Sequence, residues 1–323
     1  MPADLTASDL QQLAPIVAAA SFVFGLALGS FLNVCIYRMP RELSVVRPRS
    51  ACPNCKAPIR AYDNIPVLSW LLLRGRCRDC KAPISPRYAA VELLTALLFL
   101  SCFLRYGYSF DTLKFSSLSF LLLGLIFTDI DCKLLPDLLT LPGIFLGIGS
   151  SLVTPMPAVV SPWIPYTYWL RVPHAVLWQA QSLLESLLGT AIGALFIYGA
   201  GWLYLRLRGI EGMGFGDVKM MAMVGAFLGV EGALFTIGVA AMGATAFGIG
   251  TMLLVWVKRT QRRMSRGHRP AADSLRRAWL SASLIYRNYE IPFGAFLGTA
   301  AFLAFFYGAR VMQWYVELWS RVW

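Results

Sequence analysis

Long apolar runs recur from one end of the chain to the other, separated by shorter polar segments. A helix needs about 17–25 residues to cross roughly 30 Å of hydrocarbon. The shortest two runs are the second and the sixth. The pattern predicts an all-α polytopic membrane protein with about eight transmembrane helices, at residues 16–37, 89–104, 114–130, 138–154, 186–205, 218–231, 233–257 and 291–312.

Composition supports a membrane location. With 57% hydrophobic and 14% charged residues, the chain carries more apolar surface than a soluble core of its size would bury. The segment before the first run contains Asp4 and Asp9 but no Lys or Arg, and the run continues into Asn33. We therefore expect this run to remain as an anchor rather than to be cleaved as a signal peptide.

Positive charge is concentrated in two segments. Eleven Lys or Arg lie in 38–88 and nine in 258–290, whereas the segments assigned to the opposite side hold few. The positive-inside rule places both basic segments in the cytoplasm and the N-terminus on the opposite side of the membrane. We interpret the basic run 258–277 as topogenic charge in contact with anionic lipid, and expect the bilayer rather than nucleic acid as partner.

Four cysteines in the first basic segment form two Cys-x-x-Cys pairs, Cys52 with Cys55 and Cys77 with Cys80. This spacing is close to that of structural zinc sites. A small polar insert has too little apolar core to fold without a cross-link, and a reducing compartment disfavours disulfides, so a metal ion is the expected cross-link. A redox pair or a metal-free loop is the alternative. We expect three parts: residues 1–37 as periplasmic N-terminus and first helix, 38–88 as a cytoplasmic zinc domain, and 89–323 as a seven-helix core.

The available side chains limit the chemistry. Only two histidines occur, His174 and His268, in loops predicted on opposite sides, so neither a Ser-His-Asp triad nor an HExxH zinc site can form. Carboxylates at helix ends remain. Asp129 directly follows an apolar run, where a charge costs about 2.5–3.5 kcal/mol even on the lenient insertion scale. Function is the default explanation for such a residue.

Asp217 follows three alternate glycines in Gly212-Met-Gly214-Phe-Gly216-Asp217, just before the sixth run. The glycines remove side-chain bulk and permit unusual dihedral angles, so that a peptide backbone can approach. Two facing carboxylates share a proton, one acting as base on water and the other as acid toward the scissile carbonyl. The alternative is a structural role, with Asp129 at a helix interface and glycines that allow tight packing.

Other acids are candidates for support. Asp131 and Asp137 are expected to stay solvated, with Pro136 starting a helix and Asp137 in its first turn. Glu92 opens the second run, as an interfacial side chain or as a member of the site.

Taken together, these motifs resemble the type IV prepilin peptidases. The resemblance rests on Gly29-Ser-Phe-Leu-Asn-Val34, Tyr37-Arg38, the double Cys-x-x-Cys, Asn64-Ile-Pro66, Asp129 followed by Leu134-Leu-Pro-Asp137, and Gly212-Met-Gly-Phe-Gly-Asp-Val-Lys219. It covers about residues 20 to 300. Ala89 and Ala295 stand where the family often has proline.

The resemblance implies a function that the residues alone do not supply. Asp129 and Asp217 would be the catalytic pair of an aspartic endopeptidase, with Gly214, Gly216, Lys219, Glu92 and Asp137 in support. The substrates would be type IV prepilins and type II secretion pseudopilins. Many members also N-methylate the new N-terminus with S-adenosylmethionine, an activity associated with the region that corresponds to 38–88, although no dinucleotide-type glycine motif occurs there.

Two rival functions remain open. A presenilin-like intramembrane protease shares the Gly-x-Gly-Asp motif but has no need of a cysteine knuckle. A transporter or assembly scaffold would use Asp129 and Asp217 to relay protons and the zinc module to dock a partner. Peptide cleavage by the purified protein separates the enzyme from the scaffold.

Overall fold

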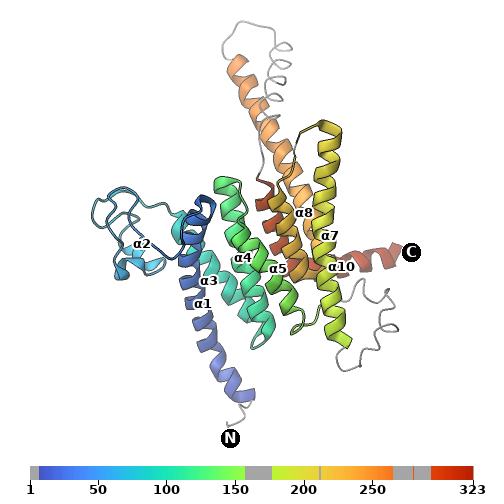
Figure 1. The fold of residues 1–323 in the computed structure, drawn as a ribbon, viewed down its shortest axis with the longest axis horizontal. Coiled ribbons are helices and arrows are strands. Elements are labelled where there is room, and N and C mark those ends of the chain that lie inside the picture. Colours follow the sequence, from blue (N-terminus) through green and yellow to red (C-terminus); the bar gives the residue numbers. More distant parts are fainter. Residues whose placement is uncertain (1–6, 157–176, 211, 265–278, 280–291, 323) are drawn as a thin grey trace.

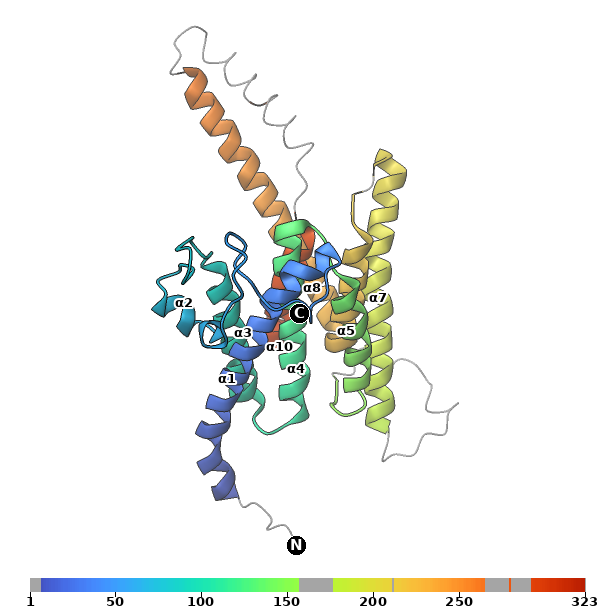
Figure 2. The same cartoon turned by 60° about the vertical axis from the view of Figure 1, so that its left-hand side comes forward.

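The computed structural model describes residues 7–156, 177–210, 212–264, 279 and 292–322. Within these ranges the protein is helical, and the only β-type pairings are two isolated bridges. His174 and His268, both predicted to lie in loops, are outside the described residues. Seven long helices form a bundle. The long helices are α1 (Ala7–Arg38), α3 (Arg87–Tyr106), α4 (Phe110–Cys132), α5 (Asp137–Ser150), α7 (Leu177–Arg208), α8 (Phe215–Met264) and α10 (Phe293–Val322). The short elements lie between α1 and α3 in the chain and sit at one side of the bundle (Figures 1 and 2).

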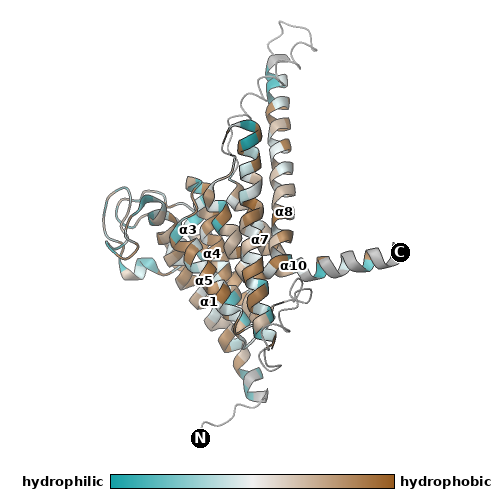
Figure 3. Ribbon diagram, turned by 45° about the vertical axis from the view of Figure 1, so that its right-hand side comes forward, coloured by the Kyte–Doolittle hydropathy of each residue, from teal (hydrophilic) through white to brown (hydrophobic). Residues whose placement is uncertain are grey.

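Each of the eight predicted apolar runs overlaps one of these helices. In the described part of the chain, five helices are long and apolar enough to cross a membrane, namely α1, α3, α4, α7 and α8, while α5 and α10 contain shorter apolar stretches. Apolar residues dominate the middle of the bundle and hydrophilic residues gather toward its ends (Figure 3). The polytopic helical architecture is confirmed, whereas the count of eight spans is not.

Helix α8 contains two of the predicted runs. Its dihedral angles are non-helical at Gly229, where φ is 70° and ψ is −170°. Only glycine adopts this conformation without strain. The helix changes direction at this residue, and its two segments follow different paths (Figures 1 and 2).

Two apolar clusters hold the bundle together. The larger joins α4, α8 and α10 through residues such as Leu122, Met221 and Leu297, all fully buried. The smaller joins α1 to α3 and α4 through Leu32, Val91 and their neighbours. Because lipid is as apolar as these side chains, close packing holds membrane helices together. The larger cluster holds α4, α8 and α10 next to one another.

The segment between α1 and α3, residues 39–86, forms a small unit that we name the cysteine module. It contains two 3-10 turns, η1 (Met39–Arg41) and η2 (Ala61–Asn64), and one short helix, α2 (Leu68–Leu72). Two similar hairpins begin at Cys52 and Cys77, and each closes with a backbone bond from that cysteine to an alanine five residues later, at 2.9 and 2.8 Å. The module is therefore built on a repeated Cys-x-x-Cys-Lys-Ala-Pro-Ile unit.

Candidate functional site

Asp129 lies in the last turn of α4, and its side chain is buried, with 5% of the residue exposed. Its Oδ2 accepts a hydrogen bond of 2.7 Å from the backbone N–H of Ala295, in the first turn of α10. Free N–H groups at a helix N-terminus favour a negative charge. The start of α10 thus provides a donor for the buried carboxylate.

Asp217 lies in the first turn of α8 and is 8% exposed. Its backbone N–H donates to the carbonyl oxygen of Gly214 at 3.1 Å, which holds the preceding chain against the helix start. Its carboxyl group interacts electrostatically with Asp129. The fold therefore brings together two buried acids that are 88 positions apart in the sequence.

Small residues surround this pair. A Cβ added at Gly294 would lie 3.1 Å from the Asp129 carboxyl carbon, and one at Gly216 would lie 2.9 Å from the Cβ of Leu135. The φ angles of Gly214 and Gly216 are not positive. At Gly216 the requirement is space: Leu135 packs where a side chain would stand.

The other acids of this region are ion-paired at the surface. Asp137 begins α5 after Pro136, as predicted, and its two carboxylate oxygens accept from the Lys219 ammonium at 2.7 and 2.8 Å. Asp131 pairs with Arg87 at the start of α3. Both aspartates are exposed. The Lys219 bridge links the beginnings of α5 and α8.

Glu92 connects α3 to the cysteine module. Its Oε2 accepts a 2.7 Å hydrogen bond from the backbone N–H of Val67, and its side chain also bonds to Ser30 of α1. Val67 has a φ of 60°, which a β-branched residue rarely adopts. Glu92 therefore fixes a strained backbone position immediately before α2.

The four cysteines of the module converge. Their sulfur atoms all lie within 4.8 Å of one another, and the sulfurs of Cys52 and Cys80 are 3.8 Å apart. Tetrahedral Zn–S bonds of about 2.3 Å would place sulfurs about 3.8 Å apart. All four are free cysteines, so the cluster fits a four-thiolate metal site.

A metal requires thiolates, and the surroundings lower the pKa of the Cys52 and Cys80 thiols. Against the hydrogen bond from the Ala57 backbone, burial and the neighbouring cysteine side chains raise the pKa of Cys55 to about 11. The backbone N–H of Ala82 lowers the pKa of the Cys80 thiol to about 6, and the Asn54 side-chain amide, 3.6 Å from that sulfur, acts in the same direction. Arg78 holds the pKa of Asp63 below its usual value and clamps η2 to the second hairpin. Such outer contacts orient metal ligands.

Sequence reasoning missed several residues of the site. The Ala295 N–H, Gly294 and Leu135 surround the aspartates, but no charge or spacing in the sequence indicates them. The sequence gives no signal for the role of Val67 either. Arg87 offered a weak signal, because a lone cation at the start of an apolar run needs a partner.

Comparison with known proteins gives two adjoining matches. Residues 23–106 match the bacterial peptidase A24 N-terminal domain, and residues 116–249 match the Type IV leader peptidase family. No solved structure matches the chain.

Curated relatives match over most of their length. A protein of Aeromonas hydrophila named prepilin leader peptidase/N-methyltransferase is 33% identical over 319 residues, covering 91% of this chain and 92% of the relative. A protein of the same name from Myxococcus xanthus is 37% identical, covering 80% of this chain and 70% of the relative. One from Neisseria gonorrhoeae is 35% identical, with coverage of 69% and 78%.

Proposed function

This chain belongs to the type IV leader peptidase family, and we propose that it removes the leader from type IV prepilins and type II secretion pseudopilins at the cytoplasmic membrane face. The observation that carries this proposal is the buried pair of interacting carboxylates, Asp129 and Asp217. A charge inside a membrane protein is retained for function by default. Relatives named prepilin leader peptidase/N-methyltransferase support the substrate class.

The pair suits acid–base hydrolysis of a peptide bond. The Ala295 N–H stabilises a negative charge on Asp129, so we assign Asp129 as the base that takes a proton from water and Asp217 as the acid that hydrogen-bonds the scissile carbonyl. Water oxygen adds to the carbonyl carbon. Collapse breaks the C–N bond, and the leaving amine takes the proton that Asp129 had accepted.

The supporting residues have structural roles in this proposal. Gly214 leaves room beside Asp217, Gly216 lets Leu135 pack against the start of α8, and the Lys219–Asp137 bridge sets the start of α8 relative to α5. Glu92 supports the site through the module junction rather than through a contact with the aspartates.

A second activity, N-methylation of the new N-terminal residue, is also part of the proposal. The relatives' names include N-methyltransferase, and we propose S-adenosylmethionine as the methyl donor. We assign this activity to the region 38–88. We further propose that its cysteines bind structural zinc, since a site closed by four thiolates leaves no position for a catalytic water.

The topology completes the proposal. We propose eight crossings of the bacterial inner membrane, with α8 contributing two that meet near Gly229, the N-terminus periplasmic and the cysteine module cytoplasmic. The parts are 1–37, 38–88 and 89–323. Neither a presenilin-like protease nor a scaffold is favoured by a separate observation.

Cleavage of a prepilin by the purified protein in lipid nanodiscs tests the assignment. Asp129→Asn and Asp217→Asn should each lower the cleavage rate by at least about a thousandfold, because each removes half of a shared acid–base pair. Asp111→Asn, at the opposite end of α4, is the matched control and should cleave normally. Substantial cleavage by either dyad variant, with normal accumulation, would sink the proposal.

A further inference from the structure

Helix α2 exposes an apolar face. Leu68, Leu71 and Leu72 are spaced so that they lie on one side of the helix, and they are 49%, 58% and 73% exposed. Trp70 instead points into the module, where its Nε1 donates to the carbonyl of Ile84 at 3.2 Å. Trp70 therefore packs inside the module, whereas the three leucines lie on its surface.

The start of α2 lies beside membrane helices, not beyond their ends. Val67 is bonded to Glu92, which is five residues into α3 and bonds in turn to Ser30 of α1. Ser30 is eight residues before the end of α1, which corresponds to about 12 Å along a helix. The cysteine module accordingly sits alongside α1 and α3 in both views (Figures 1 and 2).

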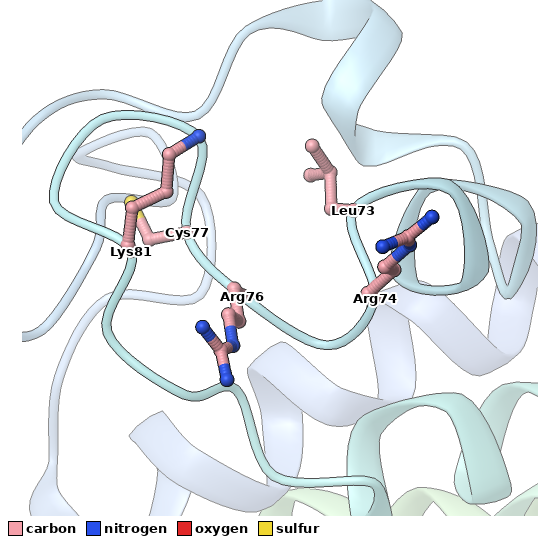
Figure 4. A pocket seen from close by; sticks show the side chains of 5 residues that line it. All are labelled: Leu73, Arg74, Arg76, Cys77 and Lys81. Atoms are coloured by element: carbon pink, nitrogen blue, oxygen red, sulfur yellow. The ribbon is translucent and has the colours of Figure 1, made fainter.

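Basic residues follow this helix in the chain. Arg74, Arg76 and Lys81 line a hollow of about 380 Å³, together with Leu73 and Cys77 (Figure 4). Three other arginines near the module are paired with carboxylates: Arg60 with Asp79, Arg78 with Asp63, and Arg87 with Asp131. Within the described residues, the three cations of the hollow form no such ion pair.

We propose that this surface, which we name the α2 anchor (Leu68, Leu71, Leu72, Arg74, Arg76 and Lys81), binds the cytoplasmic leaflet of the bilayer. The leucines enter the headgroup–acyl boundary, and the cations bind the phosphates of anionic phospholipids. A surface helix with apolar residues on one side and basic residues beside them is typical of interfacial binding. Two features favour lipid over a protein partner. The bond to Glu92 places α2 beside the membrane helices, and the three cations next to it favour anionic headgroups.

Photo-crosslinking of the full-length protein tests which partner occupies the α2 anchor. The photoreactive residue p-benzoylphenylalanine replaces Leu72, which is 73% exposed, in nanodiscs of mixed phosphatidylcholine and phosphatidylglycerol. We expect lipid adducts by mass spectrometry, enriched in phosphatidylglycerol. Adducts to protein alone, or no adducts from a variant that still cleaves prepilin, would overturn the proposal.

The repeated hairpin offers a matched charge control. Lys56 and Lys81 occupy the same position in the two hairpins, with φ of 60° and 58°. Lys81→Gln should reduce the enrichment of phosphatidylglycerol adducts about fivefold. One basic residue near an anionic membrane contributes about 1 kcal/mol of binding free energy, which corresponds to that factor. Lys56→Gln should leave it unchanged. Equal effects of the two variants would show a general charge effect and refute a specific surface.

A second measurement uses the unmodified protein. Hydrogen exchange of the backbone amides of 68–76 should be slower in nanodiscs that contain phosphatidylglycerol than in nanodiscs of phosphatidylcholine alone. Exchange in the first hairpin, residues 52–59, should not differ. Identical exchange of 68–76 in the two lipids would contradict headgroup binding whether or not the photoreactive variant folds.

Discussion

Asp129 accepts its hydrogen bond from Ala295, a residue 166 positions further along the chain. The sequence singles out Asp129 because an acid at the end of an apolar run is costly, and it singles out Asp217 through the glycines before it. It contains no comparable signal for Ala295, whose contribution is a backbone N–H that nearly every residue possesses. Candidate acids were predictable from local chemistry, whereas their donor depends on how α4 and α10 pack.

At the same scale, Glu92 leads to a test of the module junction. Glu92→Ala removes the acceptor of the Val67 N–H and should speed hydrogen exchange at that amide by at least about tenfold, since bonds to charged groups contribute about 1.5–3 kcal/mol. Exchange can be followed by mass spectrometry on the purified protein. Glu92→Gln keeps a side-chain oxygen as acceptor and should show a smaller change. An unaltered rate in the alanine variant would contradict the role given to Glu92.

At the scale of elements, apolar run length predicted the position of helices but not where they bend or end. The predicted run 138–154 corresponds to α5, which ends at Ser150 before a turn that is still apolar. The two runs placed on either side of position 232 lie in one element that breaks at Gly229. A hydropathy pattern records burial in lipid, and it does not distinguish the glycine that changes chain direction from glycines that allow close packing.

Close packing of α7 on α8 depends on such glycines. A Cβ at Gly225 would lie 2.0 Å from the carbonyl oxygen of Gly189, so Gly225→Ala must push the two backbones apart. We expect a destabilisation of about 1–3 kcal/mol, seen as a lower thermal unfolding temperature in detergent. Gly199→Ala on α7 is the matched control, because its Cβ would meet nothing within 4 Å and alanine favours the helix. Equal unfolding temperatures for the two variants would refute this account of the crossing.

At the scale of the whole molecule, the protein joins a helical bundle to a cysteine module through α1 and α3. Spacing of the cysteines predicted the four-sulfur cluster, because two Cys-x-x-Cys hairpins can close only a compact site. It did not predict that the module lies beside the helices, since that position depends on the Glu92–Val67 bond between segments 25 residues apart.

The two-part architecture predicts that the two activities separate. Replacing Cys52, Cys55, Cys77 and Cys80 with serine should release metal and unfold the module, because structural zinc contributes about 10–16 kcal/mol in small domains. The bundle should still assemble, and methylation should fall more than cleavage. Metal analysis together with mass spectrometry of the processed pilin N-terminus measures both effects. Unchanged methylation in a metal-free variant would contradict the assignment of methylation to the cysteine module.

The hydrogen bond between Ala295 and Asp129 also makes the dyad observable. Its amide proton lies between a backbone nitrogen and a carboxylate oxygen 2.7 Å away, so its NMR chemical shift follows the charge on that oxygen. Selective labelling with ¹⁵N-alanine would yield a resonance that reports the protonation state of Asp129 during pH titration or substrate binding. A proline at this position would have no such proton, so the signal depends on the alanine at position 295.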